Sequence, residues 1–141
     1  MAEPRPPDFE ELAHTADLRL RAHGASLADL FAHAAQGLFA LMQGQPAADA
    51  QPVAQAVRIA SYDTTALLVD WLSELLYLSE RDSACYHTFD IQDLTDTGLA
   101  AQISGYRPGR VACAVKAVTF FDLDIIRLDS GLYCATITLD V

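Results

Sequence analysis

Apolar and polar side chains alternate along the run Asp-Leu-Arg-Leu-Arg-Ala that begins at Asp17. Strict alternation is typical of a strand with one buried face, so the two leucines are predicted to face the core and the two arginines to face away from it. A shorter apolar segment, Phe9 to Leu12, comes first, and the break Ala13-His14-Thr15-Ala16 separates the two. The start of the chain is therefore predicted to hold two strand segments.

Apolar residues then recur at three- and four-residue spacing over 27–42 and 64–79, which predicts two amphipathic helices. Ser26 and Asp63 precede them as N-caps, residues whose side-chain oxygen accepts from a main-chain N–H of the first turn. The apolar set of the second helix, which includes Trp71, covers more than one stripe. This helix is therefore predicted to be the most buried element or to pack between two surfaces.

The remaining apolar runs are short and are separated by turn signals, as in antiparallel strands. The predicted strands are 53–60, 87–94, 99–104, 111–120, 123–128 and 132–139, with an exposed loop over 43–52. Two early helices followed by consecutive strands predict an α+β fold, with two helices packed on one face of a mostly antiparallel β-sheet. Residues 1–8, which carry three prolines, are predicted to be a flexible lead-in, and 9–141 a single domain.

Acidic side chains outnumber basic ones by 19 to 9, which gives a formal charge of −10. Strong direct binding to nucleic acid is not expected, because that binding depends on Lys and Arg contacts to phosphates. The charge suits a basic protein partner, and it equally suits an ordinary solvated acidic surface. No apolar run approaches the roughly 20 residues of a membrane span, and the first eight residues lack the apolar stretch of a signal peptide. An odd number of cysteines, three, argues against a disulfide framework, so a cytoplasmic location is expected.

Familiar catalytic and zinc-binding motifs do not occur in the sequence. The histidines and cysteines lack the paired spacing of a zinc site. No serine lies in a Gly-x-Ser-x-Gly elbow, and neither a phosphate-binding loop nor a dinucleotide fingerprint is present. His23 and His33 are predicted to be surface residues, and Cys113 and Cys134 to be small core residues.

Two aspartates stand at the ends of predicted strands. Asp17 opens the strand near the N-terminus, and Asp140 closes the last strand, followed by Val141 with a terminal carboxylate. If the fold brings these ends together, the anionic groups converge, and a bound cation removes their mutual repulsion. Ligands that are all oxygens favour Ca²⁺, Mg²⁺ or Mn²⁺ over zinc. Spacing alone favours the alternative, two ordinary strand-end residues that face water.

Two further residues carry open alternatives. His14 either orients Asp17 through a hydrogen bond or is a satisfied polar residue at a strand break. Lys116 is a lone cation in an apolar run, and it either pairs with the carboxylates or an anionic ligand or faces solvent.

Four blocks of the sequence resemble the archease family, in the family's order and over nearly the whole chain. The blocks are Phe9 to Asp17 with Gly24 and 26–31, Leu67 to Leu78, Val115 to Thr119, and Leu139 to Val141. The combination of His-Thr-Ala-Asp with the Trp-Leu-x-Glu-Leu-Leu run is specific to the family. The sequence departs from the family pattern near Tyr106 and at Phe121, where the family usually has histidines.

The resemblance implies a small α+β protein with a metal site made by Asp17, Asp140 and Val141, with Ca²⁺ as the expected ion and Mg²⁺ or Mn²⁺ as alternatives. It further implies an accessory protein, not an enzyme, that promotes guanylylation of an RtcB-type RNA ligase with GTP and multiple turnover in tRNA splicing or RNA repair. His14, Asp17, Lys116 and Asp140 are the residues expected to act in that activation. An older proposal for the family is a chaperone-like modulator of a tRNA methyltransferase. A small metal-dependent hydrolase is a third hypothesis, disfavoured because no general base other than His14 is in evidence.

Overall fold

Two helices and two antiparallel sheets make up the fold, in a computed structural model that describes residues 5–12 and 17–141. The helices are α1 (Leu27–Leu41) and α2 (Thr64–Asp82). The strands are β1 (Phe9–Leu12), β2 (Leu18–Gly24), β3 (Gln45–Ala60), β4 (Cys85–Leu94), β5 (Gly98–Arg110), β6 (Ala117–Thr119), β7 (Ile125–Arg127) and β8 (Tyr133–Asp140). The predicted α+β class is confirmed.

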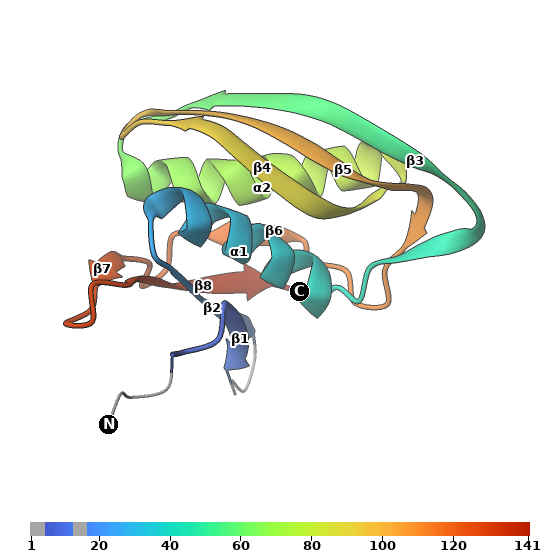
Figure 1. Cartoon of the computed structure of the whole chain (residues 1–141). Helices are drawn as coiled ribbons and strands as arrows, with labels where there is room; N and C mark the ends of the chain where they lie inside the picture. The colour runs from blue at the N-terminus through green and yellow to red at the C-terminus, as the bar shows by residue number, and fades with distance from the viewer. Residues whose placement is uncertain (1–4, 13–16) are drawn as a thin grey trace.

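The strands divide into two sheets, where the sequence led us to expect one. The first sheet has the order β1-β2-β8-β6, with β7 also paired to β8, and the second has the order β3-β5-β4. Helix α1 contacts β2 of the first sheet and β4 of the second, while α2 contacts β6 of the first and β5 and β3 of the second (Figure 1). The helices therefore have partners on two sides, as the wide apolar stripe of α2 predicts.

The core fills the space between the sheets and the helices. Its largest fully buried side chains include Trp71 of α2, Phe31 of α1 and Leu20 of β2. The indole Nε1–H of Trp71 donates to the main-chain oxygen of Phe31 at 2.9 Å, which joins the two helices by a buried polar contact. Phe89 of β4 packs edge-to-face against Trp71, with ring centroids 6.2 Å apart.

Both predicted N-caps are present. Ser26 has extended backbone angles, and its Oγ accepts from the N–H of Asp29 at 3.1 Å, while Asp63 accepts from Ala66 at 2.8 Å. These bonds satisfy main-chain donors that have no partner inside the helix.

We expect Ser26→Ala to lower the free energy of unfolding by about 1 kcal/mol, because the hydroxyl acceptor at the start of α1 is lost. Urea titration followed by far-UV circular dichroism measures this difference. Ser26→Gly is the control and is expected to cost only a few tenths of a kcal/mol. Equal stability of the alanine variant and the unsubstituted chain would contradict a capping role.

The strand boundaries differ from the prediction where main-chain partners are distant in sequence. The expected strand over 111–120 shrinks to β6, because the N–H groups of Ala112 and Cys113 both donate to the oxygen of Met42 at the end of α1, at 2.9 and 3.1 Å. The expected loop over 43–52 belongs mostly to β3, an edge strand with an irregular register between Pro46 and Gln51. The sequence Arg107-Pro108-Gly109, which is typical of a turn, lies inside β5.

The prediction that His23 and His33 are surface residues is wrong. His23 is 7% exposed, and its Nδ1 donates to the carbonyl of Pro7 at 3.0 Å. His33 is half-buried, its Nδ1 donates to the carbonyl of His23 at 2.6 Å, and its Nε2 lies 3.5 Å from the Asp8 carboxylate. Both rings lose exposure because their nitrogens contact residues 7 and 8 and the end of β2, which cover them.

Candidate functional site

The start of β2 and the end of β8 lie side by side. The antiparallel register of these strands ends with Leu18 opposite Leu139. Asp17 precedes Leu18 and Asp140 follows Leu139, so pairing continued by one step would set Asp17 opposite Asp140. Directly opposite residues of an antiparallel pair have Cβ atoms about 4.5–5.5 Å apart and point to the same face. The strand ends that carry the two predicted site aspartates are thus adjacent, although 123 positions separate the aspartates (140 − 17).

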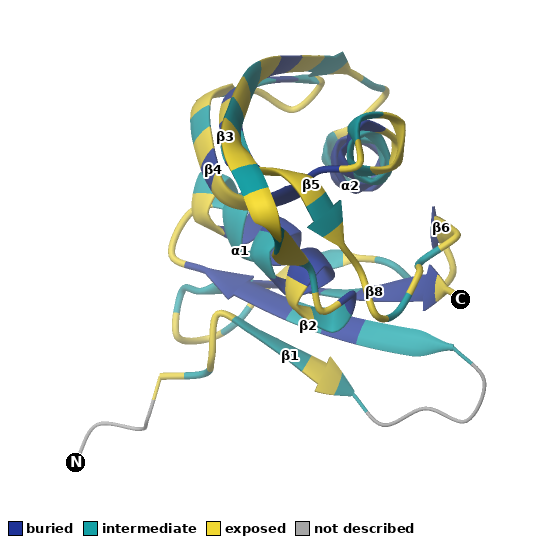
Figure 2. Ribbon diagram, turned by 90° about the vertical axis from the view of Figure 1, so that its right-hand side faces the viewer, coloured by how far each residue is buried: buried dark blue, intermediate teal, exposed yellow. Residues whose placement is uncertain are grey.

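The alternation of the strands decides the face on which these aspartates lie. Leu18 packs against the core and Leu139 is fully buried, so the next pair outward points away from the core. Asp140 is exposed and Asp17 is half-buried. Figure 2 shows the end of β8 beside β6 at the margin of the molecule. This corner therefore carries an exposed Asp140 and, at the adjacent strand end, a half-buried Asp17.

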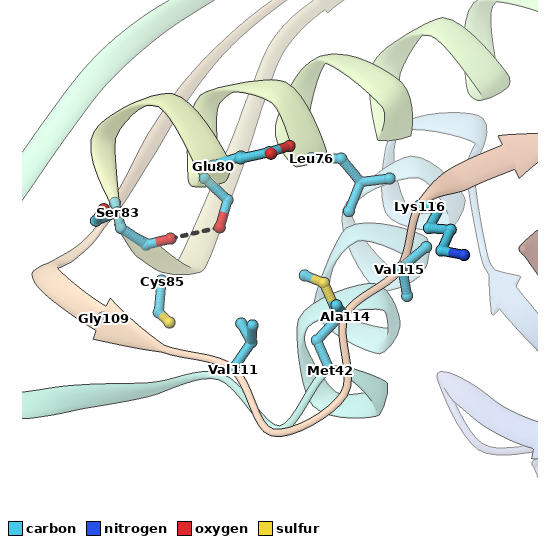
Figure 3. A pocket seen from close by; sticks show the side chains of 12 residues that line it. Met42, Leu76, Glu80, Ser83, Cys85, Gly109, Val111, Ala114, Val115 and Lys116 are labelled. Atoms are coloured by element: carbon cyan, nitrogen blue, oxygen red, sulfur yellow. Dashed lines mark hydrogen bonds between the residues drawn. The ribbon is translucent and has the colours of Figure 1, made fainter. Parts of the chain in front are cut away.

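Lys116 adjoins the same corner through its main chain. Its N–H donates to the carbonyl of Asp140 at 2.7 Å, and the next residue, Ala117, pairs with Asp140 in the register of β6 and β8. Its side chain lines a cavity on the side of α2, and in Figure 3 the ammonium group points away from that cavity. Lys116 is thus attached to Asp140 through its main chain and borders this corner.

Of the other two predicted site residues, the structure describes only Val141. Val141 follows Asp140 at the end of β8, and its side chain is 41% exposed. His14 lies outside the described residues, so its role remains a prediction. Phe121, where the family usually has histidine, is 72% exposed, and it belongs to the connection between β6 and β7.

Within residues 5–12 and 17–141, no group of three or more His, Cys, Asp or Glu side chains is arranged to hold a metal ion. A metal ion at this corner would therefore be bound by two side-chain carboxylates, together with main-chain oxygens or oxygens of a bound molecule. Carboxylate and main-chain oxygens are the ligands of hard cations such as Ca²⁺ and Mg²⁺. The donor set fits such an ion and does not fit zinc, which prefers nitrogen and sulfur.

A cavity of about 510 Å³ that was not expected from the sequence lies next to this corner (Figure 3). Its lining comes from the ends of both helices, the start of β4, the end of β5 and the segment before β6. The thiol of Cys85 lies in its wall, and burial raises the pKa of that thiol. No local motif marks a cavity assembled from separate segments, so the sequence carries no signal for it.

Neither helix in the described part of the chain is long and apolar enough to cross a bilayer. This agrees with the absence of a long apolar run in the sequence.

Comparison with known proteins gives consistent matches over nearly the whole chain. The model of the Archease protein family matches residues 9–141. "Protein archease" of Methanosarcina acetivorans is 32% identical, with 94% of this chain and 95% of the relative covered. "Protein archease" of Methanothermobacter thermautotrophicus is also 32% identical, with 94% and 98% covered.

Two solved structures share the fold. The solution structure of a Methanobacterium thermoautotrophicum protein superposes with a TM-score of 0.73 at 30% identity, covering 95% of this chain and 99% of that one. A crystal structure from Thermotoga maritima, described as an archease and possible chaperone, gives a TM-score of 0.66 over the full length of both chains. At 15% identity, the second likeness concerns the fold alone.

Proposed function

The chain belongs to the archease family, and we propose that it is a non-enzymatic accessory protein that activates an RtcB-type RNA ligase. In this role it promotes guanylylation of the ligase with GTP and multiple turnover, in tRNA splicing or RNA repair. The observation that carries the proposal is the pairing of Leu18 with Leu139, which makes Asp17 and Asp140 the next residues at two adjacent strand ends. We call Asp17, Asp140 and Val141 the acidic tip.

The acidic tip would hold a hard divalent ion through the two carboxylates and a main-chain oxygen of Val141. Two like charges on neighbouring strands repel each other, and a cation between them removes that cost. Ca²⁺ takes six to eight oxygen ligands, and Mg²⁺ or Mn²⁺ about six, so these groups leave positions open. In the complex, oxygens of the ligase or of its nucleotide would fill those positions, and the bound ion would supply positive charge there.

The charge of the chain supports a protein partner over a nucleic acid. With a net charge of −10, the surface repels phosphates and attracts a basic surface. A ligase that binds RNA and GTP has basic groups around its active site, because it must neutralise phosphates. The acidic tip is therefore expected to dock at that active site, while RNA itself binds to the ligase.

We expect Asp17→Asn and Asp140→Asn each to abolish stimulation of the ligase, because each removes one anionic ligand from the tip without changing its shape. The measurements are guanylylation of the ligase by GTP, RNA joining over several turnovers, and Ca²⁺ binding by calorimetry. The Ca²⁺ affinity should fall at least tenfold. Asp129→Asn is the matched control, since Asp129 is exposed in the turn before the other end of β8. Full stimulation by both tip variants would overturn the proposed mechanism.

A second function is a chaperone or modulator of a tRNA-modifying enzyme such as a tRNA methyltransferase. The description of the Thermotoga maritima relative as a possible chaperone favours it, although those words concern that protein. This function predicts client binding that does not depend on Asp17. Pull-down of the methyltransferase with the unsubstituted chain and with Asp17→Asn separates the two functions.

A further inference from the structure

The cavity beside the acidic tip has a mainly apolar wall. Apolar side chains from three segments face it in Figure 3. They are Met42, Leu76, Val111, Ala114 and Val115. At about 510 Å³, the space is within the usual size range of binding cavities, roughly 300–1,000 Å³. An apolar group would be stabilised there, because it would leave water for an apolar surface.

The polar groups of the wall are largely committed to partners within the chain. Ser79 donates its hydroxyl proton to the carbonyl of Ala84 at 2.6 Å, and the Cys85 thiol lies 3.3 Å from the carbonyl of Arg110. Among the described lining residues, Glu80 and Lys116 carry the charges, and both are exposed. The wall therefore offers an apolar interior and a charged margin, and few free polar groups for a polar ligand.

The margin at Glu80 favours a cation. Glu80 belongs to the last turn of α2, where unpaired main-chain carbonyls add negative potential to that of the carboxylate. The chain as a whole also carries ten negative charges in excess. A lysine or arginine that lies beside an apolar group in the occupant would pair with Glu80.

The cavity and the acidic tip share a boundary. Lys116 lines the cavity, and its N–H is bonded to the carbonyl of Asp140 at 2.7 Å. A protein that covers Asp140 therefore reaches the mouth of the cavity in the same contact. The wall near that mouth, 111–116, lies outside the strands and is attached to α1 through the carbonyl of Met42.

We infer that the cavity is the anchor pocket of the partner interface, and that it receives an apolar side chain of the ligase with a neighbouring lysine or arginine paired to Glu80. This inference rests on the proposed function and adds a binding determinant separate from the acidic tip. Binding energy in interfaces concentrates where such a side chain fills a pocket at the centre of the contact. The acidic tip then supplies the charge, and the cavity supplies most of the affinity.

The experiment compares two tryptophan substitutions in the same segment. Ala114→Trp places a large ring into the cavity wall, while Ala112→Trp changes an exposed alanine that does not line it. We expect Ala114→Trp to raise the dissociation constant for the ligase at least tenfold, measured by calorimetry. Ala112→Trp should bind like the unsubstituted chain, and Ca²⁺ affinity should be unchanged in both. Ligase binding by Ala114→Trp with unchanged affinity would overturn the inference.

Glu80→Lys tests the charged margin without altering the core, because Glu80 is an exposed helical residue. It should weaken ligase binding at least fivefold and leave Ca²⁺ binding unchanged. This variant tests the inference even if Ala114→Trp proves unstable. Unchanged ligase binding by Glu80→Lys would overturn the predicted lysine or arginine. If the unsubstituted chain binds no ligase, the proposed function fails together with this inference. If it binds and stimulates the ligase while both cavity variants do the same, the inference alone fails.

Discussion

Alanine in place of Gly105 is expected to lower the free energy of unfolding by about 3 kcal/mol, the upper part of the range for overpacking. Gly105 lies in β5 opposite Tyr86 of β4. A Cβ atom there would overlap the carbonyl oxygen of Cys85 and lie 2.7 Å from the Cα of Tyr86. Both neighbours are main chain, so no side-chain rotation relieves the overlap, and the two strands must separate locally.

Gly98→Ala is the matched control in the same strand. Its Cβ atom would meet the Thr95 hydroxyl at 3.4 Å, an ordinary contact, so a change below about 1 kcal/mol is expected. Guanidinium unfolding followed by circular dichroism compares both variants with the unsubstituted chain. Equal stability of the two alanine variants would show that β4 and β5 tolerate a wider spacing at Gly105.

Trp71→Ala is expected to cost about 3–5 kcal/mol, the usual loss for a buried aromatic residue. Trp71 is fully buried in α2, and its replacement removes the packing against Phe89 and the hydrogen bond to the carbonyl of Phe31. A cavity would remain between the helices and the second sheet, because the surrounding elements relax only partly.

Two controls separate the packing of Trp71 from other effects. Trp71→Phe keeps a ring and loses the indole N–H, so it should cost clearly less than the alanine variant. Tyr62→Ala removes an aromatic side chain that is 91% exposed and should leave stability within about 0.5 kcal/mol. Circular dichroism is the suitable probe, because Trp71 is the single tryptophan of the chain. A loss of less than 1 kcal/mol for Trp71→Ala would contradict its place in the core.

The helices could be predicted from the sequence because their determinants are local. The periodic apolar positions and the caps at Ser26 and Asp63 lie within a few residues of the bonds they determine. The wide stripe around Trp71 also correctly predicted contacts on two sides. The strand over 111–120 could not be predicted correctly, because the oxygen that takes its N–H groups belongs to Met42, about 70 positions earlier (112 − 42).

The aspartates of the candidate site were predicted to be neighbours only by the family resemblance, and not by their positions in the sequence. Their spacing in the sequence by itself favours two unrelated strand ends. The pairing of Leu18 with Leu139 makes their strand ends adjacent, and that pairing depends on which strands are adjacent and in which register. His23 and His33 were predicted to be surface residues, but residues 7 and 8 cover them. That segment precedes each histidine by more than ten positions, so local sequence does not predict the contact.

The prolines of β3 have a consequence for association between copies of the chain. β3 runs for 16 residues along one margin of its sheet, and a margin of this length is a template for strand addition and fibre growth. Pro46 and Pro52 have no N–H to donate, and the ladder is interrupted between Pro46 and Gln51. An incoming strand would meet gaps in the row of donors that it needs. The margin therefore resists polymerisation, and the long ribbon in Figure 1 can stay open to water.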